Sequence, residues 1–364
     1  MFSLHIDTGR DWRGTQGQTL HTVLGMRAIG HRAALVAHPD GELRQRMSGG
    51  DDVVPLTSRR EVDMDAAWNL SRVVKQLRPQ VVHIHDPSAL AMAATALSIL
   101  APEPRPVLVA SQRTAQHIPH DSFSQWTQTQ VDCFIANSRF VQDHLVSDGI
   151  PRARTTTVSD GVDIERIVKL PTANVHAACF LPTHAPIVGT VGSLTPQNGL
   201  HHLIDAATLV VREVPDVRFV IIGDGELRES LERHVHETHL ERHVFLTGFK
   251  VNALEFIKGF DLLAVSSISG GIYTALVDAM AASKAAVATA AGGIPEAVVD
   301  NETGFLVPPR DHRAMADKLV VLLKDPDLSR RMGAAALARA RERFAVERMV
   351  AETVAVYERL MIAG

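Results

Sequence analysis

Short apolar segments alternate with longer amphipathic segments along the first half of the chain. The short segments have the length of buried strands and cover residues 4–6, 33–37, 81–85, 107–110, 134–136 and 156–158. The longer segments have helical spacing and cover residues 16–29, 66–77 and 88–100. Strands that alternate with helices are typical of a parallel sheet covered by helices on both faces. The pattern therefore predicts an α/β domain over residues 1–166.

The same alternation resumes in the second half after an irregular segment. Predicted strands cover residues 187–191, 217–222, 244–246, 262–266, 286–289 and 305–307, with helical segments between them. Residues 167–186 lose this periodicity and contain three of the prolines, so we interpret them as an interdomain linker. A chain of 364 residues also exceeds the usual size of one hydrophobic core. We expect a second domain over residues 187–343 and a C-terminal helix, residues 344–364, that packs back on the first domain.

The turn after residue 191 is the most informative part of the sequence. An apolar strand ends at Val191, Gly192 follows, and a helical pattern begins near Gly199. Unpaired N–H groups and a partial positive charge at a helix N-terminus attract anions, so this turn predicts a phosphate site. An ordinary strand-to-helix connection is the alternative. The turn has neither the glycine series of dinucleotide-binding proteins nor a Walker lysine, which argues against a dehydrogenase or a P-loop enzyme.

Charge and cysteine content narrow the classes of function. The formal net charge is -4 and the basic residues are scattered, so we expect no nucleic-acid partner. The two cysteines, Cys133 and Cys179, form no metal or redox motif, which is typical of a cytoplasmic protein. Residues 1–7 have the pattern of a strand rather than of a signal peptide, and the longest apolar run is shorter than the roughly 20 residues of a membrane span. We therefore expect a cytoplasmic location and leave open a peripheral contact with the inner face of the membrane.

A series of short motifs spans nearly the whole chain. In chain order they include His5-Ile6-Asp7-Thr8-Gly9-Arg10, Val82-His83-Ile84-His85-Asp86, Ile135-Ala136-Asn137-Ser138, Asp160-Gly161-Val162-Asp163, Ile222-Gly223-Asp224-Gly225, Thr247-Gly248-Phe249, Ala291-Gly292-Gly293-Ile294-Pro295-Glu296 and Gly304-Phe305-Leu306-Val307. In this order they resemble the retaining nucleotide-sugar glycosyltransferases of family 4, in particular bacterial members that build envelope polysaccharide or lipopolysaccharide. The resemblance implies the GT-B fold, in which two doubly wound Rossmann-like domains face each other across a cleft. It also implies a nucleotide-diphosphate sugar as donor, a glycan or lipid-linked acceptor, and neither a cofactor nor a metal.

The donor site implied by this resemblance has lost several charged groups. Ser193 and Asn198 stand where the family has an arginine and a lysine that contact the donor diphosphate. Gly270 and Asp278 stand where it has two glutamates, the second of which binds the ribose hydroxyls. Tyr273 replaces a glycine and is expected to crowd this pocket. Because the loss of one preorganised group that stabilises transition-state charge costs about 10²–10³ in rate, these changes predict weak turnover.

The resemblance also assigns the remaining candidate residues. Those predicted to bind the donor are Gly14, Gly192, Ser193, Asn198, Gly270, Gly271, Asp278, Gly292, Gly293 and Glu296. Helix capping is the alternative role for Glu296. His85, at the end of a strand, and His117, in a loop that also holds His120, are the predicted catalytic residues on the acceptor side. The alternatives are packing for His85 and a solvated loop position for His117.

Two other groups of residues have simpler explanations than a metal site. His236, His239 and His243 have a spacing that suits zinc, but solvated histidines are the simpler explanation. Asp63 and Asp65 lie at a predicted helix start, where capping and the helix dipole favour aspartate. We expect neither group to bind a metal.

The sequence supports two hypotheses from different classes. The first is a hexosyltransferase-type glycosyltransferase that is retaining, metal-independent and slow. The second is a catalytically inactive relative that binds a nucleotide, a glycan or a partner enzyme. The loss of charged groups at Ser193, Asn198 and Gly270 motivates the second hypothesis.

Overall fold

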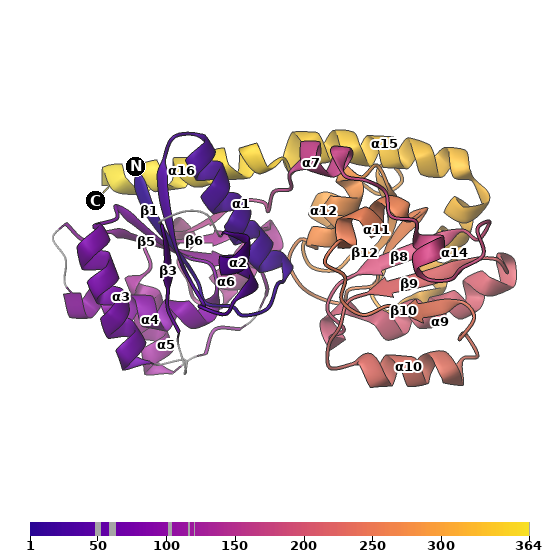
Figure 1. Ribbon diagram of the computed structural model, residues 1–364, viewed down its shortest axis with the longest axis horizontal. Helices are drawn as coiled ribbons and strands as arrows, with labels where there is room; N and C mark the ends of the chain where they lie inside the picture. Colours follow the sequence, from indigo (N-terminus) through magenta and orange to yellow (C-terminus); the bar gives the residue numbers. More distant parts are fainter. Residues whose placement is uncertain (48–51, 58–62, 101–103, 116, 120, 364) are drawn as a thin grey trace. The chain divides into compact units, whose positions relative to one another are not determined.

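The chain folds into two compact units (Figure 1). The computed structural model describes residues 1–47, 52–57, 63–100, 104–115, 117–119 and 121–363. The first unit comprises residues 1–161 and 346–364, and the second comprises residues 162–345. Each unit is a parallel sheet with helices on both faces, as the alternation of strands and helices predicts. Among the described residues, no helix combines the length and the apolar character needed to span a membrane.

The first unit is built on a seven-stranded parallel sheet with the order β3-β2-β1-β4-β5-β6-β7. Its strands are β1 (Phe2–Asp7), β2 (Arg32–Ala37), β3 (Val53–Pro55), β4 (Val81–Ile84), β5 (Val107–Gln112), β6 (Cys133–Ala136) and β7 (Thr155–Thr157). Its helices are α1 (Gly14–Ala28), α2 (Glu42–Arg46), α3 (Met64–Leu77), α4 (Pro87–Leu100), α5 (Ser122–Gln130), α6 (Arg139–Ser147), the 3₁₀ helix η1 (Arg152–Arg154) and α16 (Val346–Ala363). The strand order reverses between β1 and β4, and ligands bind at such a reversal in doubly wound sheets.

Alternation along the strands divides the side chains of this sheet between two cores. Leu4 and Ile6 of β1 pack with apolar residues of α3, α4 and α6. On the other face, apolar residues of α1, α2 and α16 form a second core. Ser3, His5 and Asp7 of β1 are fully buried, and Ser3 and Asp7 bond to side chains of α1 on this second face. A row of buried polar groups on one face is unusual for a core strand and points to a role beyond packing.

The C-terminal helix belongs to the first unit. Helix α16 packs along α1, where Gly25 permits a close approach of the two helices. A Cβ atom on Gly25 would lie 2.4 Å from Val350 Cγ2, so any side chain here would push the helices apart. The helix also places Tyr357 in the buried polar row of the sheet, where its hydroxyl contacts His83.

The second unit has a six-stranded parallel sheet with the order β10-β9-β8-β11-β12-β13. Its strands are β8 (Ile187–Val191), β9 (Arg218–Ile222), β10 (Val244–Leu246), β11 (Leu262–Val265), β12 (Ala285–Thr289) and β13 (Gly304–Val307). Its helices are α7 (Ile164–Lys169), α8 (Val175–Ala178), η2 (Pro196–Asn198), α9 (Leu200–Glu213), α10 (Arg228–Glu237), α11 (Ala253–Gly259), α12 (Thr274–Ala281), α13 (Ile294–Ala297), α14 (His312–Lys324) and α15 (Pro326–Arg343). Apolar residues of α7, α11, α12 and α15 form the core on one face, and those of α9, α10 and α14 form the core on the other.

Residues 167–186, expected as a linker, are part of the second unit. The chain enters that unit at Val162, and helices α7 and α8 follow at once. Ile167, Val175 and Leu181 are buried in its core. Helices of six and four residues are too short to show a periodicity in the sequence, and the three prolines of this segment suggested a loop.

Candidate active site

Three histidines meet inside the first unit on the buried polar face of its sheet. His5 of β1 lies opposite His83 of β4, and His85 follows directly after β4. The ring centroids of His83 and His85 are 4.0 Å apart, and His5 Nδ1 lies 2.9 Å from His85 Nε2. Burial lowers the pKa of His5 to about 3 and holds the pKa values of His83 and His85 well below 6.5. The three rings are therefore neutral near pH 7.

His85 has one ring nitrogen without a partner. Its Nδ1 is buried and has no hydrogen bond among the described residues. The other ring nitrogens of the cluster pair with Tyr357 Oη at 2.5 Å, Ser111 Oγ at 2.8 Å, Ser3 Oγ at 2.9 Å and each other. The unpaired nitrogen of a neutral imidazole can form one hydrogen bond with a substrate hydroxyl. A general base must take up a proton during the reaction, and the strongly lowered pKa of His85 disfavours this. The geometry of His85 thus suits substrate contact better than proton transfer.

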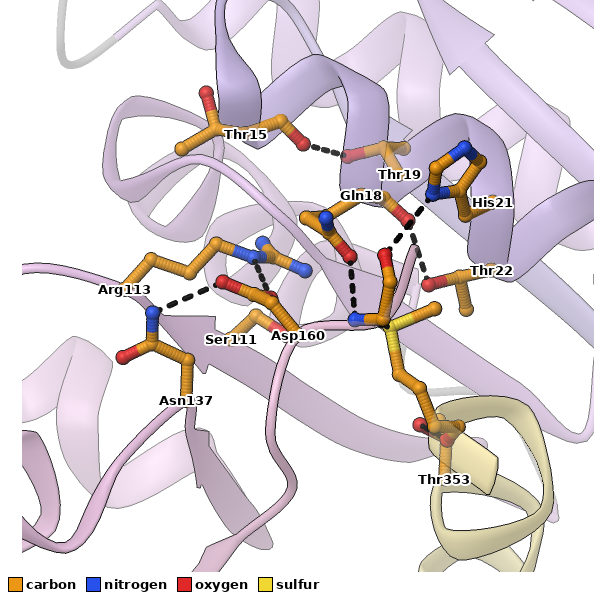
Figure 2. A network of polar contacts seen from close by, with 12 residues as sticks. Thr15, Gln18, Thr19, His21, Thr22, Ser111, Arg113, Asn137, Asp160 and Thr353 are labelled. Carbon is orange, nitrogen blue, oxygen red and sulfur yellow. Dashed lines mark hydrogen bonds and ion pairs between the residues drawn. The ribbon is translucent and has the colours of Figure 1, made fainter. Parts of the chain in front are cut away.

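A buried ion pair lies just beyond the neighbouring strands (Figure 2). Arg113 Nε donates to Asp160 Oδ1 at 2.9 Å, and Asn137 Nδ2 donates to Asp160 Oδ2 at 2.9 Å. The Arg113 and Asp160 side chains are 10% and 7% exposed. Asn137 and Asp160 fall within the sequence motifs, but Arg113 was not predicted. An arginine directly after a buried strand, at the edge where ligands bind, is the signal that could have identified it.

Three buried polar atoms without partners mark this edge of the first sheet. They are His85 Nδ1, Arg113 Nη1 and Asn137 Oδ1, each unpaired among the residues that the structure describes. These residues follow β4, β5 and β6, which are neighbours in the sheet. Buried polar groups in native proteins are nearly all hydrogen-bonded, so an exception calls for an unseen partner such as a ligand or water. An imidazole, a guanidinium and an amide oxygen together suit a ligand with hydroxyl or phosphate groups.

His117 belongs to a different cluster. Its Nδ1 lies 2.9 Å from Asp148 Oδ1, beside the last turn of α6, and its ring packs against that of His144. Helix α6 follows β6 and runs back from the carboxyl edge of the sheet, so its last turn lies away from that edge. The structure therefore does not bring the two predicted catalytic histidines together. His120 lies outside the described residues.

Gly14 is the first residue of α1 rather than part of the preceding loop. Arg13 N–H donates to Gln16 Oε1 at 3.2 Å at this helix start. One turn on, Gln18 Oε1 accepts from Gly161 N–H at 3.0 Å (Figure 2), directly after the buried Asp160. The beginning of α1 is thus anchored beside the ion pair.

In the second unit, the turn after β8 has the predicted strand-turn-helix form. Helix α9 begins at Leu200, directly after Gly199 with a φ of 57°. A Cβ on Gly199 would lie 2.3 Å from Ser266 O, so glycine is required on both grounds. Asn198 Nδ2 donates to Ser193 O at 2.6 Å. The side chain of Asn198, which stands in place of the lysine, therefore stabilises the turn through this hydrogen bond.

Two backbone amides that we expected to face phosphate oxygens are already paired. Gly192 N–H donates to Ile222 O at 2.9 Å, and Gly293 N–H donates to Gly270 O at 3.1 Å. The reason is close packing of the turns, since a Cβ on Gly292 would lie 1.9 Å from Gly270 O. The two amides hold neighbouring loops together instead of facing a ligand.

Other amides at the same edge remain available. The N–H groups of Ser193, Gly271 and Gly292 have no hydrogen-bond partner within residues 162–345, all of which the structure describes. They belong to loops that follow β8, β11 and β12, at the carboxyl edge of the second sheet. Backbone N–H groups gathered at such an edge make an anion-binding surface without a charged side chain.

Tyr273 covers the Gly192 turn. Its hydroxyl donates to Val191 O at 2.6 Å, and a Cβ on Gly192 would lie 1.8 Å from the hydroxyl oxygen. Burial raises the pKa of Tyr273, so the hydroxyl remains a neutral donor. Tyr273 was expected to crowd the donor pocket, and its hydroxyl does pack directly against the Gly192 turn.

If the turn holds the diphosphate that the sequence predicts, Tyr273→Phe should raise the affinity for UDP about fivefold, because loss of the hydroxyl opens space at Gly192 worth about 1 kcal/mol. The same change should lower the free energy of unfolding by about 1 kcal/mol, since the bond to Val191 O is lost. Calorimetric titration and urea unfolding measure the two effects. A fall in UDP affinity would instead identify the hydroxyl as a phosphate donor.

Asp278 and Glu296 occupy different environments in the second unit. Asp278 lies on α12 and is partly exposed, yet desolvation of its carboxyl raises its pKa to about 7, with Arg166 opposing the shift. A carboxyl perturbed in this way is a candidate for a functional site. Glu296 lies on the short helix α13, directly after the Gly292–Gly293 turn, and its N–H donates to Gly293 O at 3.0 Å.

Asp278 makes the second unit sensitive to pH. Its pKa of about 7 in the folded state exceeds the value of 3.8 for an ordinary aspartate, so the folded state holds the extra proton between these values. Stability must then fall as the pH rises from about 4 to about 7. We expect Asp278→Asn to raise the free energy of unfolding by about 1–3 kcal/mol near pH 8 and hardly at all near pH 4. Urea unfolding at both pH values is the measurement, and an equal gain at both would contradict the assignment.

The two other groups considered as metal ligands have ordinary structural roles. The Asp63 side chain accepts from Ala66 N–H at 3.0 Å, which confirms the capping interpretation. His236 Nδ1 lies 2.7 Å from Glu241 Oε1, whereas His243 Nδ1 lies 3.1 Å from Val217 O. Within the described residues, these histidines do not converge on a common point.

Sequence comparison relates both units to known families. Residues 12–166 match the family described as Glycosyltransferase Family 4, and residues 174–339 match that described as Glycosyl transferases group 1. The chain is 31% identical over 155 residues to N-acetyl-α-D-glucosaminyl L-malate synthase of Bacillus anthracis, over 43% of this chain and 40% of that protein. It is 32% identical over 188 residues to D-inositol 3-phosphate glycosyltransferase of Corynebacterium urealyticum, over 48% and 44% of the two chains.

Structure comparison gives the fold. HepE from Anabaena, solved in complex with UDP, matches with a TM-score of 0.83 and 21% identity over 99% of this chain and 100% of that one. Sequence matches to curated relatives are shorter and span 40–63% of the length of those proteins. The chain therefore carries a family 4 and a group 1 glycosyltransferase region on a GT-B fold.

Proposed function

We propose that this protein transfers a hexosyl group from a nucleotide-diphosphate sugar to a hydroxyl of an envelope glycan or a lipid-linked acceptor. We further propose that the anomeric configuration is retained and that no metal ion takes part. The observation that carries the proposal is the turn of Gly192–Gly199, which contains the unpaired amide of Ser193 and leads into α9. A helix N-terminus of this kind favours a diphosphate. The UDP bound to HepE, which has the same fold, supports a nucleotide donor.

The donor would lie along the carboxyl edge of the second sheet. In the reaction, the bond from the anomeric carbon to the diphosphate oxygen breaks and a bond to the acceptor oxygen forms, while the acceptor proton passes to the leaving phosphate or to water. Negative charge grows on the departing diphosphate, and donors fixed in advance stabilise it most effectively. The amides of Ser193, Gly271 and Gly292 are the proposed donors, and Asp278 is the proposed acceptor for the ribose hydroxyls.

The polar edge of the first unit would hold the acceptor or the transferred sugar. His85 Nδ1, Arg113 Nη1 and Asn137 Oδ1 are the groups with unused hydrogen-bonding capacity among the described residues there. Sugar hydroxyls both donate and accept, so they can satisfy a donor and an acceptor side by side. A lipid-linked acceptor would bring the protein to the inner face of a membrane.

An inactive relative that only binds its ligand is the second candidate. The replacement of charged groups by Ser193, Asn198 and Gly270 motivates it. The transferase is favoured because both units match glycosyltransferase families and a relative at 32% identity is named D-inositol 3-phosphate glycosyltransferase.

An assay of donor turnover separates the two candidates. The protein is incubated with UDP-hexoses and GDP-hexoses, with and without a chelator, and release of the nucleoside diphosphate is followed. We expect slow release that the chelator leaves unchanged, and an NMR spectrum of the first sugar product with the anomeric configuration of the donor. Binding of a nucleotide sugar without any release would support the inactive relative and reject the transferase.

A further inference from the structure

A cluster of two histidines and one aspartate lies in the first unit, outside the polar edge described above. His144 and Asp148 are four residues apart at the C-terminal end of α6, and His117 comes from the segment after β5. His117 Nδ1 lies 2.9 Å from Asp148 Oδ1, and His144 Nε2 lies 3.8 Å from Asp148 Oδ2. The two imidazole centroids are 4.5 Å apart. One nitrogen or oxygen from each side chain falls within 4.8 Å of the other two.

His144 Nε2 is buried and has no hydrogen bond among the described residues. The distance of 3.8 Å to Asp148 Oδ2 is too long for a hydrogen bond. A buried ring nitrogen without a partner is costly and calls for an unseen partner. Its position beside a carboxylate oxygen and a second imidazole indicates what kind of partner would fit.

The donor set is that of a divalent transition metal. Imidazole nitrogen and carboxylate oxygen both bind Zn²⁺ at about 2.0–2.2 Å, so two ligand atoms on a tetrahedral ion lie about 3.3 Å apart. The separations of 2.9 Å and 3.8 Å found here lie on either side of that value. The two separations run to different oxygens of the Asp148 carboxylate, but one ligand atom of each side chain lies within 4.8 Å of the other two. Small side-chain rotations would therefore place three such atoms around one ion, with water in the fourth position.

The surroundings suit an ion that exchanges with solvent. The His117 side chain is 78% exposed, which provides a route to the site, whereas Asp148 is only 6% exposed. Asp148 Oδ2 also accepts from Ile118 N–H at 3.0 Å, which fixes the carboxylate in place. Such outer contacts orient the ligands of metal sites. By contrast, His5, His83 and His85 are 0–3% exposed and all but one of their ring nitrogens already have partners, so an ion has no route to them.

If His117 and Asp148 formed only a hydrogen-bonded pair, His144 would not be needed beside them. The chain offers such a pair in the second unit, where His236 Nδ1 lies 2.7 Å from Glu241 Oε1 and the histidine is likewise 78% exposed. That pair has no second imidazole beside it among the described residues. It therefore serves as a matched control for the cluster of the first unit.

We propose that His117, His144 and Asp148 form a binding site for a divalent transition-metal ion, with Zn²⁺ as the best fit. The bound ion would tie the segment after β5 to the end of α6 and so stabilise the first unit. The site lies at the last turn of α6, away from the carboxyl edge of the sheet. Its role is thus structural, and the inference does not depend on the proposed transferase activity.

The test is titration of the tag-free protein with Zn²⁺ by calorimetry. We expect one binding event per chain and an increase in Tm of about 5 °C when the free ion reaches about a hundred times the Kd. His117→Ala and His144→Ala should each weaken binding at least about tenfold, in the range seen when contacts of a metal site are removed. His236→Ala should bind Zn²⁺ like the unchanged protein.

His117→Ala keeps the test decisive, because an exposed side chain can be removed without loss of the fold. Visible absorption by Co²⁺ in place of Zn²⁺ provides a second readout, since its intensity reports a tetrahedral nitrogen and oxygen site. Failure of the unchanged protein to bind at micromolar Zn²⁺ would overturn the proposal. Equal affinity of the His117→Ala and unchanged proteins would overturn it as well. Neither result would bear on donor turnover, which is measured separately.

Discussion

Arg113→Met should lower the free energy of unfolding by about 3–5 kcal/mol, the largest effect that we expect from a single change. Arg113 is the cationic partner of Asp160, and the two side chains are only 10% and 7% exposed. Methionine fills much of the same volume but leaves the carboxylate buried, with the Asn137 amide as its remaining side-chain donor among the described residues. Removing one partner of a buried pair costs far more than the pair contributes, because the other charge stays without compensation. Urea unfolding followed by circular dichroism measures the loss.

Arg105→Met is the matched control for this change. Arg105 also pairs with an aspartate, Asp132, at 2.9 Å, but these side chains are 41% and 35% exposed. Exposed pairs contribute about 0–1 kcal/mol, so this variant should be nearly as stable as the unchanged protein. The double variant Arg113→Met, Asp160→Asn should recover part of the lost stability, since no unpaired charge remains. Equal losses for the two arginine variants would show that Arg113 and Asp160 are not a desolvated pair.

Ser193→Arg should raise donor turnover by about 10²-fold if the proposed function is correct. Ser193 lies on the turn that opens α9, and a guanidinium here would lie beside the proposed diphosphate. A preorganised cation acts mainly on the charge that grows as the diphosphate leaves, so kcat should rise more than the affinity for the donor. We do not expect the same from Gly270→Glu, because Gly270 has a φ of 128°, which a glutamate adopts only with strain.

Gln197→Arg is the control for the added charge. Gln197 belongs to the same turn, in the short helix η2, and is exposed. The Gln197→Arg variant adds the same charge at an exposed position, where solvent and salt screen it, so we expect less than a few-fold change in turnover. Steady-state release of UDP from a UDP-hexose measures both variants. A similar rise in turnover in both variants would show that the added charge acts only by attracting the donor to the protein. No rise in either variant would show that the acceptor side limits turnover.

Much of the fold is predictable from local patterns. Apart from β3, the strands of both sheets have enough apolar residues at regular spacing to be identified from the sequence, as have the longer helices. The strand β3, of three residues, and the helices α2, α7 and α8, of four to six residues, were missed because each contains less than two periods of its own pattern. The glycine turn that begins α9 was predicted correctly, because the end of a strand, a glycine and the start of a helix are adjacent in the sequence.

The contacts at the candidate site are less predictable because they join residues that are far apart in the chain. Arg113 and Asp160 are separated by 47 positions, and Tyr273 and Val191 by 82. Nothing in the local sequence of either partner indicates the other, and the partner decides whether the group is paired or available for a ligand. The same reason explains Gly293, whose amide pairs with Gly270 O and not with a phosphate.

The most direct test of the account is calorimetric titration of the unchanged protein with UDP-hexoses and GDP-hexoses at low and high ionic strength. The account holds that a diphosphate is bound mainly by the backbone amides of Ser193, Gly271 and Gly292, without a cationic side chain at Ser193 or Asn198. It predicts one binding site for at least one of these donors, with an affinity that changes little with salt because screening acts mainly on exposed charges. Absence of binding by every donor, or an affinity that falls steeply with salt, would contradict it.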